Sequence, residues 1–139
     1  TTYYCRTALG LTADGRPIMD EISYQGTVMI GKATLPVAGI DCERGADSLV
    51  LYNKWYGTHT RTNEYGKEYT VRQGKVVAVS TGDSKIPVDG VVVSVHGTAA
   101  AALADVKIGD NVQIVQDLGD KWNNVPDIMG AGPRLVQAG

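Results

Sequence analysis

Glycine recurs along this chain so often that only short helices and strands fit between the turns. There are 17 glycines in 139 residues, and four of them belong to the turn-forming pairs Asp14-Gly15, Tyr65-Gly66, Gln73-Gly74 and Gly109-Asp110. The stretches between these pairs are short and rich in β-branched residues, a pattern typical of strands joined by tight turns. The sequence therefore predicts an α+β fold dominated by a mixed, mostly antiparallel β-sheet with one short helix.

The glycine pairs also predict how the strands are joined. Asp14-Gly15 tolerates the positive φ of a two-residue hairpin, so residues 8–12 and 17–22 are expected to be its arms. Gln73-Gly74 is expected to join residues 68–72 to residues 75–80 in the same way. Further strands are expected at residues 27–30, 48–52, 111–116 and 133–137.

The apolar run from Gly90 to Ser94 is the best candidate for the centre of the sheet, because its side chains need cover on both faces. The alanine-rich residues 99–104 follow it and are expected to form the helix, since alanine is the strongest helix former. The Thr98 side chain is expected to cap this helix by accepting a hydrogen bond from its first turn.

The composition fits one globular domain of 139 residues, with 43% hydrophobic and 20% charged residues. The net charge is −2 and no run of lysine or arginine occurs, so nucleic acid is not an expected partner. The apolar runs fall far short of the roughly 20 residues that cross a bilayer, and the chain is not expected to be transmembrane.

Cys5 and Cys42 lack the spacing of a zinc or thioredoxin motif, and the sequence allows either one disulfide or two buried thiols.

Two segments near the C-terminus share motifs with a known family. Residues 86–100 read Ile-Pro-Val-Asp-Gly-Val-Val-Val-Ser-Val-His-Gly-Thr-Ala-Ala, which is similar to its strand-then-helix block. Residues 127–136 read Asp-Ile-Met-Gly-Ala-Gly-Pro-Arg-Leu-Val and resemble its Gly-Gly-Gly-Pro-x-Leu-Val signature, with Ala131 in place of the middle glycine. On these motifs the chain resembles the phosphodiester glycosidase family, that is, the C-terminal portion of an N-acetylglucosamine-1-phosphodiester α-N-acetylglucosaminidase-like domain.

Two upstream segments extend the resemblance. Residues 56–68 match the family's Gly-x-x-Thr-x-Thr-Asn-x-x-Gly-x-Glu pattern. Residues 41–52 are similar to a family segment that reads Asn-x-x-Arg and continues into an apolar strand ending in Tyr, with Asp41 where asparagine is expected. The resemblance thus covers essentially the whole chain and is strongest from residue 40 onward.

The resemblance implies hydrolysis of a glycosyl phosphodiester, as in removal of the N-acetylglucosamine that caps mannose 6-phosphate. A glycan or sugar phosphate is the implied partner, no cofactor or metal is expected, and the implied location is extracellular or the cell envelope of a bacterium. Family members usually carry an earlier Asn-Gly-Gly-Phe-Phe-like strand, and this chain contains no phenylalanine. The chain is therefore expected to lack the N-terminal portion of the domain, so that a missing segment or a second copy of the chain completes the site. The alternative is a non-catalytic glycan-binding or cell-envelope module.

The matched positions supply candidate catalytic residues. Arg44 is expected to bind the phosphate, because a planar guanidinium donates two parallel hydrogen bonds to such an anion. Glu68, Asp127 and Asp41 are candidates for the carboxylate that acts on water or on the anomeric carbon, since a phosphate monoester with a second pKa of about 6 leaves without much help. The structural alternatives are a surface arginine, a solvated glutamate at a strand edge and a turn-forming aspartate.

Substrate binding is expected from residues around these groups. His96, Gly97 and Thr98 lie at the predicted helix start, where unpaired N–H groups favour an anion, although a simple cap is the alternative. The other candidates are Asp41, Thr60, Thr62, Asn63, Ser94, Gly130 and Gly132, of which the two threonines and Asn63 serve equally well to close a loop. Tyr65 is the aromatic residue best placed to stack on a sugar ring.

Overall fold

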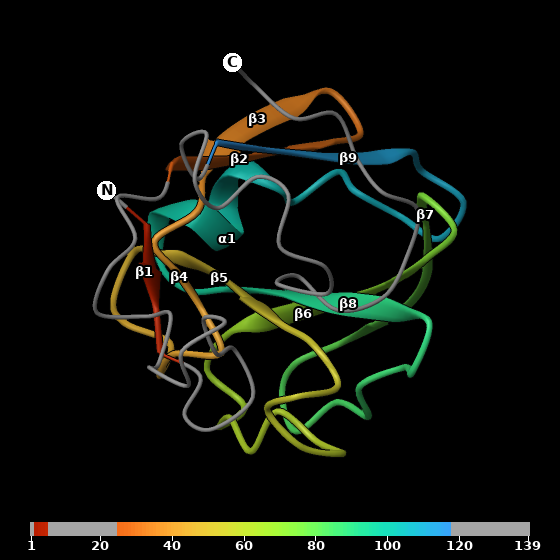
Figure 1. Cartoon of the computed structure of the whole chain (residues 1–139). Coiled ribbons are helices and arrows are strands. Elements are labelled where there is room, and N and C mark those ends of the chain that lie inside the picture. The colour runs from red at the N-terminus through yellow and green to blue at the C-terminus, as the bar shows by residue number, and fades with distance from the viewer. Residues whose placement is uncertain (1, 6–24, 118–139) are drawn as a thin grey trace.

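The computed structural model describes residues 2–5 and 25–117, which form two β-sheets and one short helix (Figure 1). The elements are β1 (Tyr3–Tyr4), β2 (Gln25–Ile30), β3 (Ala33–Pro36), β4 (Gly39–Ile40), β5 (Leu49–Tyr52), β6 (Lys67–Arg72), β7 (Lys75–Ser80), β8 (Gly90–Val95), α1 (Thr98–Ala102) and β9 (Val112–Asp117). Most strand pairs are antiparallel, while β4 pairs in parallel with both β1 and β5. The predicted α+β fold is confirmed.

The larger sheet has six strands in the order β1-β4-β5-β8-β6-β7. β8 lies inside it, antiparallel to β5 and β6, and all six of its residues are buried. The first residue of this strand, Gly90, must be glycine, because a Cβ there would lie 1.9 Å from the Val71 carbonyl oxygen. The prediction of a central strand from Gly90 to Ser94 is therefore confirmed.

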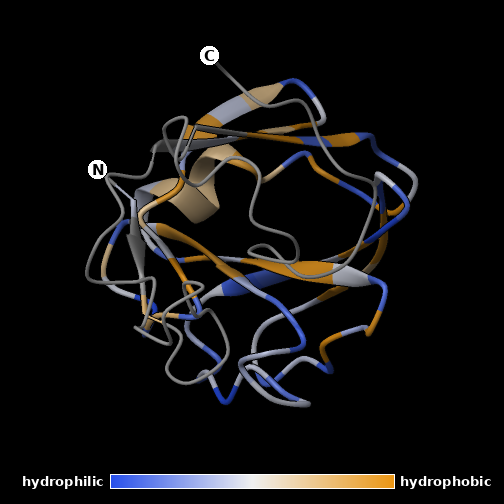
Figure 2. Cartoon of the chain, in the orientation of Figure 1, coloured by the Kyte–Doolittle hydropathy of each residue, from blue (hydrophilic) through white to orange (hydrophobic). Residues whose placement is uncertain are grey.

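The smaller sheet has the order β3-β2-β9 and packs over one face of the larger sheet, with α1 at one side of the space between them (Figure 1). Val91, Val93 and Val95 of β8 point into the main core that fills this space. The hydrophobic colouring in Figure 2 follows the strands that enclose this core. Val92 and Ser94 alternate with those residues and point to the opposite face. The apolar cluster on that second face is small and consists of Val50, Tyr52, Ile86 and Val92.

The other strands predicted from the sequence are confirmed only in part. The hairpin through Gln73-Gly74 and the strands near residues 27–30, 48–52 and 111–116 are confirmed. β1, β3 and β4 were not predicted, because they are two to four residues long and carry little periodicity of their own. The expected strands at residues 8–12, 17–22 and 133–137 lie outside the described residues.

The helix begins at Thr98 and ends at Ala102, two residues before the predicted end. Gly97 is the N-cap residue, and no side chain at that position caps the helix. The prediction that Thr98 caps the helix is wrong, because Thr98 is itself the first helical residue. The Thr98 N–H instead donates to Asp47 Oδ1 at 2.8 Å, a contact across 51 residues that local sequence does not reveal.

Cys5 and Cys42 form a disulfide that joins positions 37 residues apart. Of the two alternatives that the sequence allows, the structure therefore has the disulfide. It ties the segment of β1 to the loop that follows β4 and precedes Arg44. In the described part of the chain, no helix has the length and apolar character needed to cross a membrane.

Candidate functional site

Two loops meet over the second face of the larger sheet. Residues 53–66 connect β5 to β6, and residues 81–89 connect β7 to β8. The Thr60 N–H donates to the Ser84 carbonyl oxygen at 2.9 Å, and the Ile86 N–H donates to the Thr58 carbonyl oxygen at 2.8 Å. The two loops therefore hold each other in place above Ser94 and the other side chains of this face.

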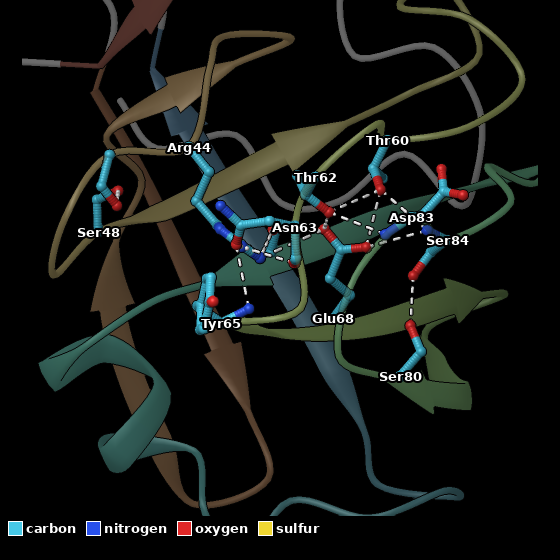
Figure 3. A network of polar contacts seen from close by, with 12 residues as sticks. Arg44, Ser48, Thr60, Thr62, Asn63, Tyr65, Glu68, Ser80, Asp83 and Ser84 are labelled. Atoms are coloured by element: carbon cyan, nitrogen blue, oxygen red, sulfur yellow. Dashed lines mark hydrogen bonds and ion pairs between the residues drawn. The ribbon is translucent and has the colours of Figure 1, made fainter.

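Glu68 of β6 is the centre of a polar network beneath these loops (Figure 3). Its side chain is 0% exposed. Oε1 accepts hydrogen bonds from Thr60 Oγ1 at 2.8 Å and from the Ser84 N–H at 3.2 Å. Oε2 accepts hydrogen bonds from Thr62 Oγ1 and Ser94 Oγ, each at 2.7 Å. One carboxylate thus ties both loops to β6 and β8.

The protonation of Glu68 follows from this environment. Burial alone would raise its pKa, but the hydrogen bonds from Ser84, Ser94, Thr62 and Thr60 stabilise the carboxylate more strongly. The pKa of Glu68 is therefore lowered from its ordinary value of 4.5. Glu68 is ionised at neutral pH with four donors on its oxygens, an environment that favours holding the loops over exchanging a proton with a ligand.

Arg44 completes the network at its outer edge, with a side chain that is 4% exposed. Nη1 donates to Ser94 Oγ at 3.1 Å and lies 3.7 Å from Glu68 Oε2. Nη2 donates to both the backbone oxygen of Asn63, at 3.1 Å, and its Oδ1, at 3.0 Å. Gly66 leaves the space that the guanidinium fills, since a Cβ there would lie 2.3 Å from Arg44 Nη1. The alternatives of a surface arginine and a solvated glutamate do not hold for this buried pair.

A pocket of about 290 Å³ opens beside this network. Its lining combines two arginines, one acid, one amide, two threonines and two tyrosines, namely Glu43, Arg44, Tyr52, Tyr56, Thr60, Arg61, Thr62 and Asn63. Guanidinium and amide N–H groups suit phosphate oxygens, and a partly exposed tyrosine such as Tyr56 suits the C–H face of a sugar, whereas Tyr52 is buried. Four of the predicted residues line this pocket, and Glu68 and Ser94 support it from beneath.

Arg61 is a cationic residue of this pocket that sequence analysis missed. It is exposed, its guanidinium carbon lies 4.6 Å from the centre of the Tyr56 ring, and its Nη2 is 3.4 Å from the Tyr56 carbonyl oxygen. The available signal was its place between Thr60 and Thr62. Because both threonines turn toward Glu68, the residue between them is directed away from the network. That signal is useful only once the role of Glu68 is known.

Asp41 does not line the pocket. It is buried, its φ is 56°, and its Oδ1 accepts a hydrogen bond from the Asn53 N–H at 2.9 Å. Aspartate tolerates this left-handed conformation better than most residues. In the structure Asp41 holds the residue that follows β5, so its contact there is structural.

The residues predicted at the helix start make contacts of their own. The His96 N–H donates to the Ser48 carbonyl oxygen at 3.2 Å, and Asp47 already occupies the N–H of Thr98. Thr98 lines a different pocket, of about 590 Å³, together with Asp47 and Ser48. The structure therefore brings Arg44, Thr60, Thr62, Asn63, Glu68 and Ser94 together and leaves His96, Gly97 and Thr98 outside that group.

Some candidates lie outside the described residues, namely Asp127, Gly130 and Gly132. Within residues 2–5 and 25–117, no group of three or more His, Cys, Asp or Glu side chains is arranged to hold a metal ion.

Tyr65, the predicted stacking residue, is 82% exposed beside the network, and its N–H donates to Asn63 Oδ1 at 3.1 Å (Figure 3).

Comparison with known proteins identifies similar folds. No family profile and no curated protein matches the chain. A hypothetical protein from Synechocystis matches 81% of the chain with a TM-score of 0.59 and 20% identity. A protein from Burkholderia pseudomallei K96243, assumed to be exported, matches 68% of the chain with a TM-score of 0.56 and 17% identity. The chain spans 22% and 25% of the lengths of these two proteins. At these identities the similarity shows the fold alone.

Proposed function

We propose that this chain carries the sugar-phosphate site of an enzyme that hydrolyses glycosyl phosphodiesters. The observation that carries the proposal is the pocket of about 290 Å³, where Arg61, Asn63 and Tyr56 lie together over an ordered polar network. The motifs shared with the phosphodiester glycosidase family point to the same class of ligand.

In this proposal Arg61 and Asn63 make the direct contacts to the phosphate. Arg61 is exposed, and no acidic side chain of the described residues forms an ion pair with it. Asn63 uses Oδ1 for Arg44 and Tyr65, which leaves its amide N–H groups for a ligand oxygen. Arg44 keeps its bonds to Asn63 and so holds the Asn63 side chain in place.

Thr60 and Thr62 line the pocket in this proposal and do not bind the phosphate. Each hydroxyl donates to Glu68, and each accepts a backbone N–H, from Ser84 at 2.9 Å and from Asp83 at 3.0 Å respectively. Their hydrogen-bonding capacity is thus largely used within the protein. Glu68 is then a positioning residue, because it fixes both threonines and, through Ser94, the Arg44 guanidinium.

The reaction breaks the bond between the anomeric carbon and the phosphate oxygen. Water adds to the anomeric carbon, and the phosphate leaves as a monoester that needs little protonation, since its second pKa is about 6. The carboxylate that would activate the water is expected to be Asp127. In the described part of the chain, Glu43 is the carboxylate that lines the pocket.

A non-catalytic module that binds the same ligands is the second candidate. The observation that favours it is the state of Glu68, which is buried, ionised and saturated with donors. The pocket then supplies recognition, and Glu68 beneath it holds the loops and does not exchange a proton with the ligand.

An extracellular or cell-envelope location is part of the proposal. The Cys5–Cys42 disulfide supports it, because disulfides persist mainly in oxidising compartments. The similarity to a Burkholderia protein assumed to be exported is in keeping with it.

The test is incubation of the full chain with N-acetylglucosamine 1-phosphate methyl diester in ¹⁸O-labelled water. The enzyme proposal predicts methyl phosphate as a product by ³¹P NMR, with no label in the phosphate, because the bond to phosphorus stays intact. Label on the phosphate would reject it, because the bond to phosphorus would have broken instead. Binding without any product supports the module.

A matched pair of variants checks the pocket in the same experiment. Arg61→Ala is expected to weaken diester binding by about tenfold, the scale of a lost charge-assisted hydrogen bond. Arg72→Ala removes the charge of another exposed arginine. Arg72 pairs with Asp89 at 2.8 Å outside this pocket, so this variant is expected to bind the diester as the parent does. Equal loss in both variants would contradict a specific role for Arg61.

A further inference from the structure

A second pocket adjoins the first one at Arg61. It measures about 480 Å³ and is lined by Tyr56, Gly57, Thr58, His59, Arg61 and Asp83. Tyr56 and Arg61 line both pockets. A phosphate bound to Arg61 would therefore have one substituent on the side of each pocket.

Asp83 is the acidic residue of the second pocket. It is exposed, and its carboxylate points away from the Glu68 network (Figure 3). Over residues 2–5 and 25–117, no lysine, arginine or histidine forms an ion pair with it. Its charge is thus left for a ligand.

The backbone around Asp83 is held firmly. Its N–H donates to Thr62 Oγ1 at 3.0 Å, and its φ is 50°. Gly82 packs so closely that a Cβ there would lie 2.1 Å from the Asn63 carbonyl oxygen. The turn that carries Asp83 is therefore fixed against the segment that carries Arg61.

We propose that the second pocket binds the alcohol half of the phosphodiester and that Asp83 selects an alcohol bearing an amine, such as an ethanolamine or an amino sugar. This inference rests on the proposed function, because Arg61 must hold the phosphate between the two pockets. Arg61 and Asp83 then present opposite charges to one zwitterionic group, the phosphate to the arginine and the ammonium to the aspartate.

The test uses ligands that cannot be hydrolysed, namely N-acetylglucosamine derivatives in which a CH₂ group joins the anomeric carbon to a phosphonate. The 2-aminoethyl and propyl esters differ in charge at nearly equal size. Calorimetry on the full chain at low salt is expected to show the aminoethyl ester binding about two- to fivefold more tightly, the range of an exposed ion pair. High salt is expected to reduce this ratio because it screens exposed charges.

Variants then assign the preference to Asp83. Asp83→Asn is expected to bring the ratio close to one, and asparagine tolerates the same positive φ. Asp105→Asn, which neutralises an exposed aspartate outside both pockets, is expected to keep the parent ratio. A preference that persists in Asp83→Asn would overturn the assignment.

The ester pair on the unmodified protein separates the two proposals even if a variant fails to fold. Equal binding of both esters would overturn the role of Asp83 and leave the proposed function standing. Failure of both esters to bind would overturn the inference together with the proposed function on which it rests.

Discussion

Glu68 organises the candidate site more than any other residue, and replacing it gives a sharp test. Glu68→Gln would place an amide against Ser and Thr donors, and we expect it to lower the free energy of unfolding at pH 7 by about 2–3 kcal/mol. Glu64→Gln, at an exposed position in the same loop, is expected to change it by less than about 0.5 kcal/mol. Urea unfolding of the two variants measures both values.

The pH dependence of the same unfolding checks the cause. The pKa of Glu68 is lower in the folded state than in the unfolded chain. The ionised carboxylate therefore adds to the free energy of unfolding above about pH 4.5, and this stabilisation is lost as the pH falls through the folded-state pKa. The difference between the parent and Glu68→Gln should therefore shrink on acidification below about pH 4.5. A difference that stays constant would show that ionisation of Glu68 is not what stabilises the loops.

Single residues show what a sequence can predict about a site. Motif similarity selected Arg44, Thr60, Thr62, Asn63 and Glu68, and the structure brings all five together. Their individual contacts could not be predicted, because burial and hydrogen-bond partners depend on two loops that meet only in the folded chain.

The β5–β6 loop depends on Gly66, where space rather than backbone conformation excludes a side chain. A Cβ at Gly66 would lie 2.3 Å from Arg44 Nη1 and 2.5 Å from the Val95 carbonyl oxygen. Gly66→Ala is expected to cost about 1–3 kcal/mol of stability and to displace Arg44 from Asn63. Gly45→Ala, whose nearest contact would be Ser48 Oγ at 3.6 Å, is the matched control and should fold at least as stably as the parent. Thermal unfolding distinguishes them, and equal stabilities would contradict this explanation.

Elements were predicted where local pattern decides them. β8 follows from its continuous apolar run, and β6 with β7 follows from the Gln73-Gly74 turn. β1 and β4 pair in parallel across 36 residues, and the Thr98 N–H at the start of α1 donates to Asp47, which lies 51 residues away. Such contacts leave no periodic signal, so only the folded chain reveals them.

For the whole molecule, the disulfide is a covalent cross-link between the segment of β1 and the loop after β4. Replacing Cys5 and Cys42 together by serine opens a loop of 37 residues and is expected to lower the free energy of unfolding by about 2–4 kcal/mol. Denaturant unfolding of the parent with and without a reductant gives an independent estimate of the same quantity. If both treatments left the midpoint unchanged, the disulfide would not be a stabilising link.

The claim that matters most is that the pocket of about 290 Å³ binds a sugar phosphate through Arg61. A crystal structure of the full chain with N-acetylglucosamine 1-phosphate tests it most directly. We predict phosphate oxygens within about 3 Å of the Arg61 guanidinium and the sugar against Tyr56. A phosphate bound at Asp47 to Thr98 or elsewhere on the chain, with this pocket empty, would contradict the account.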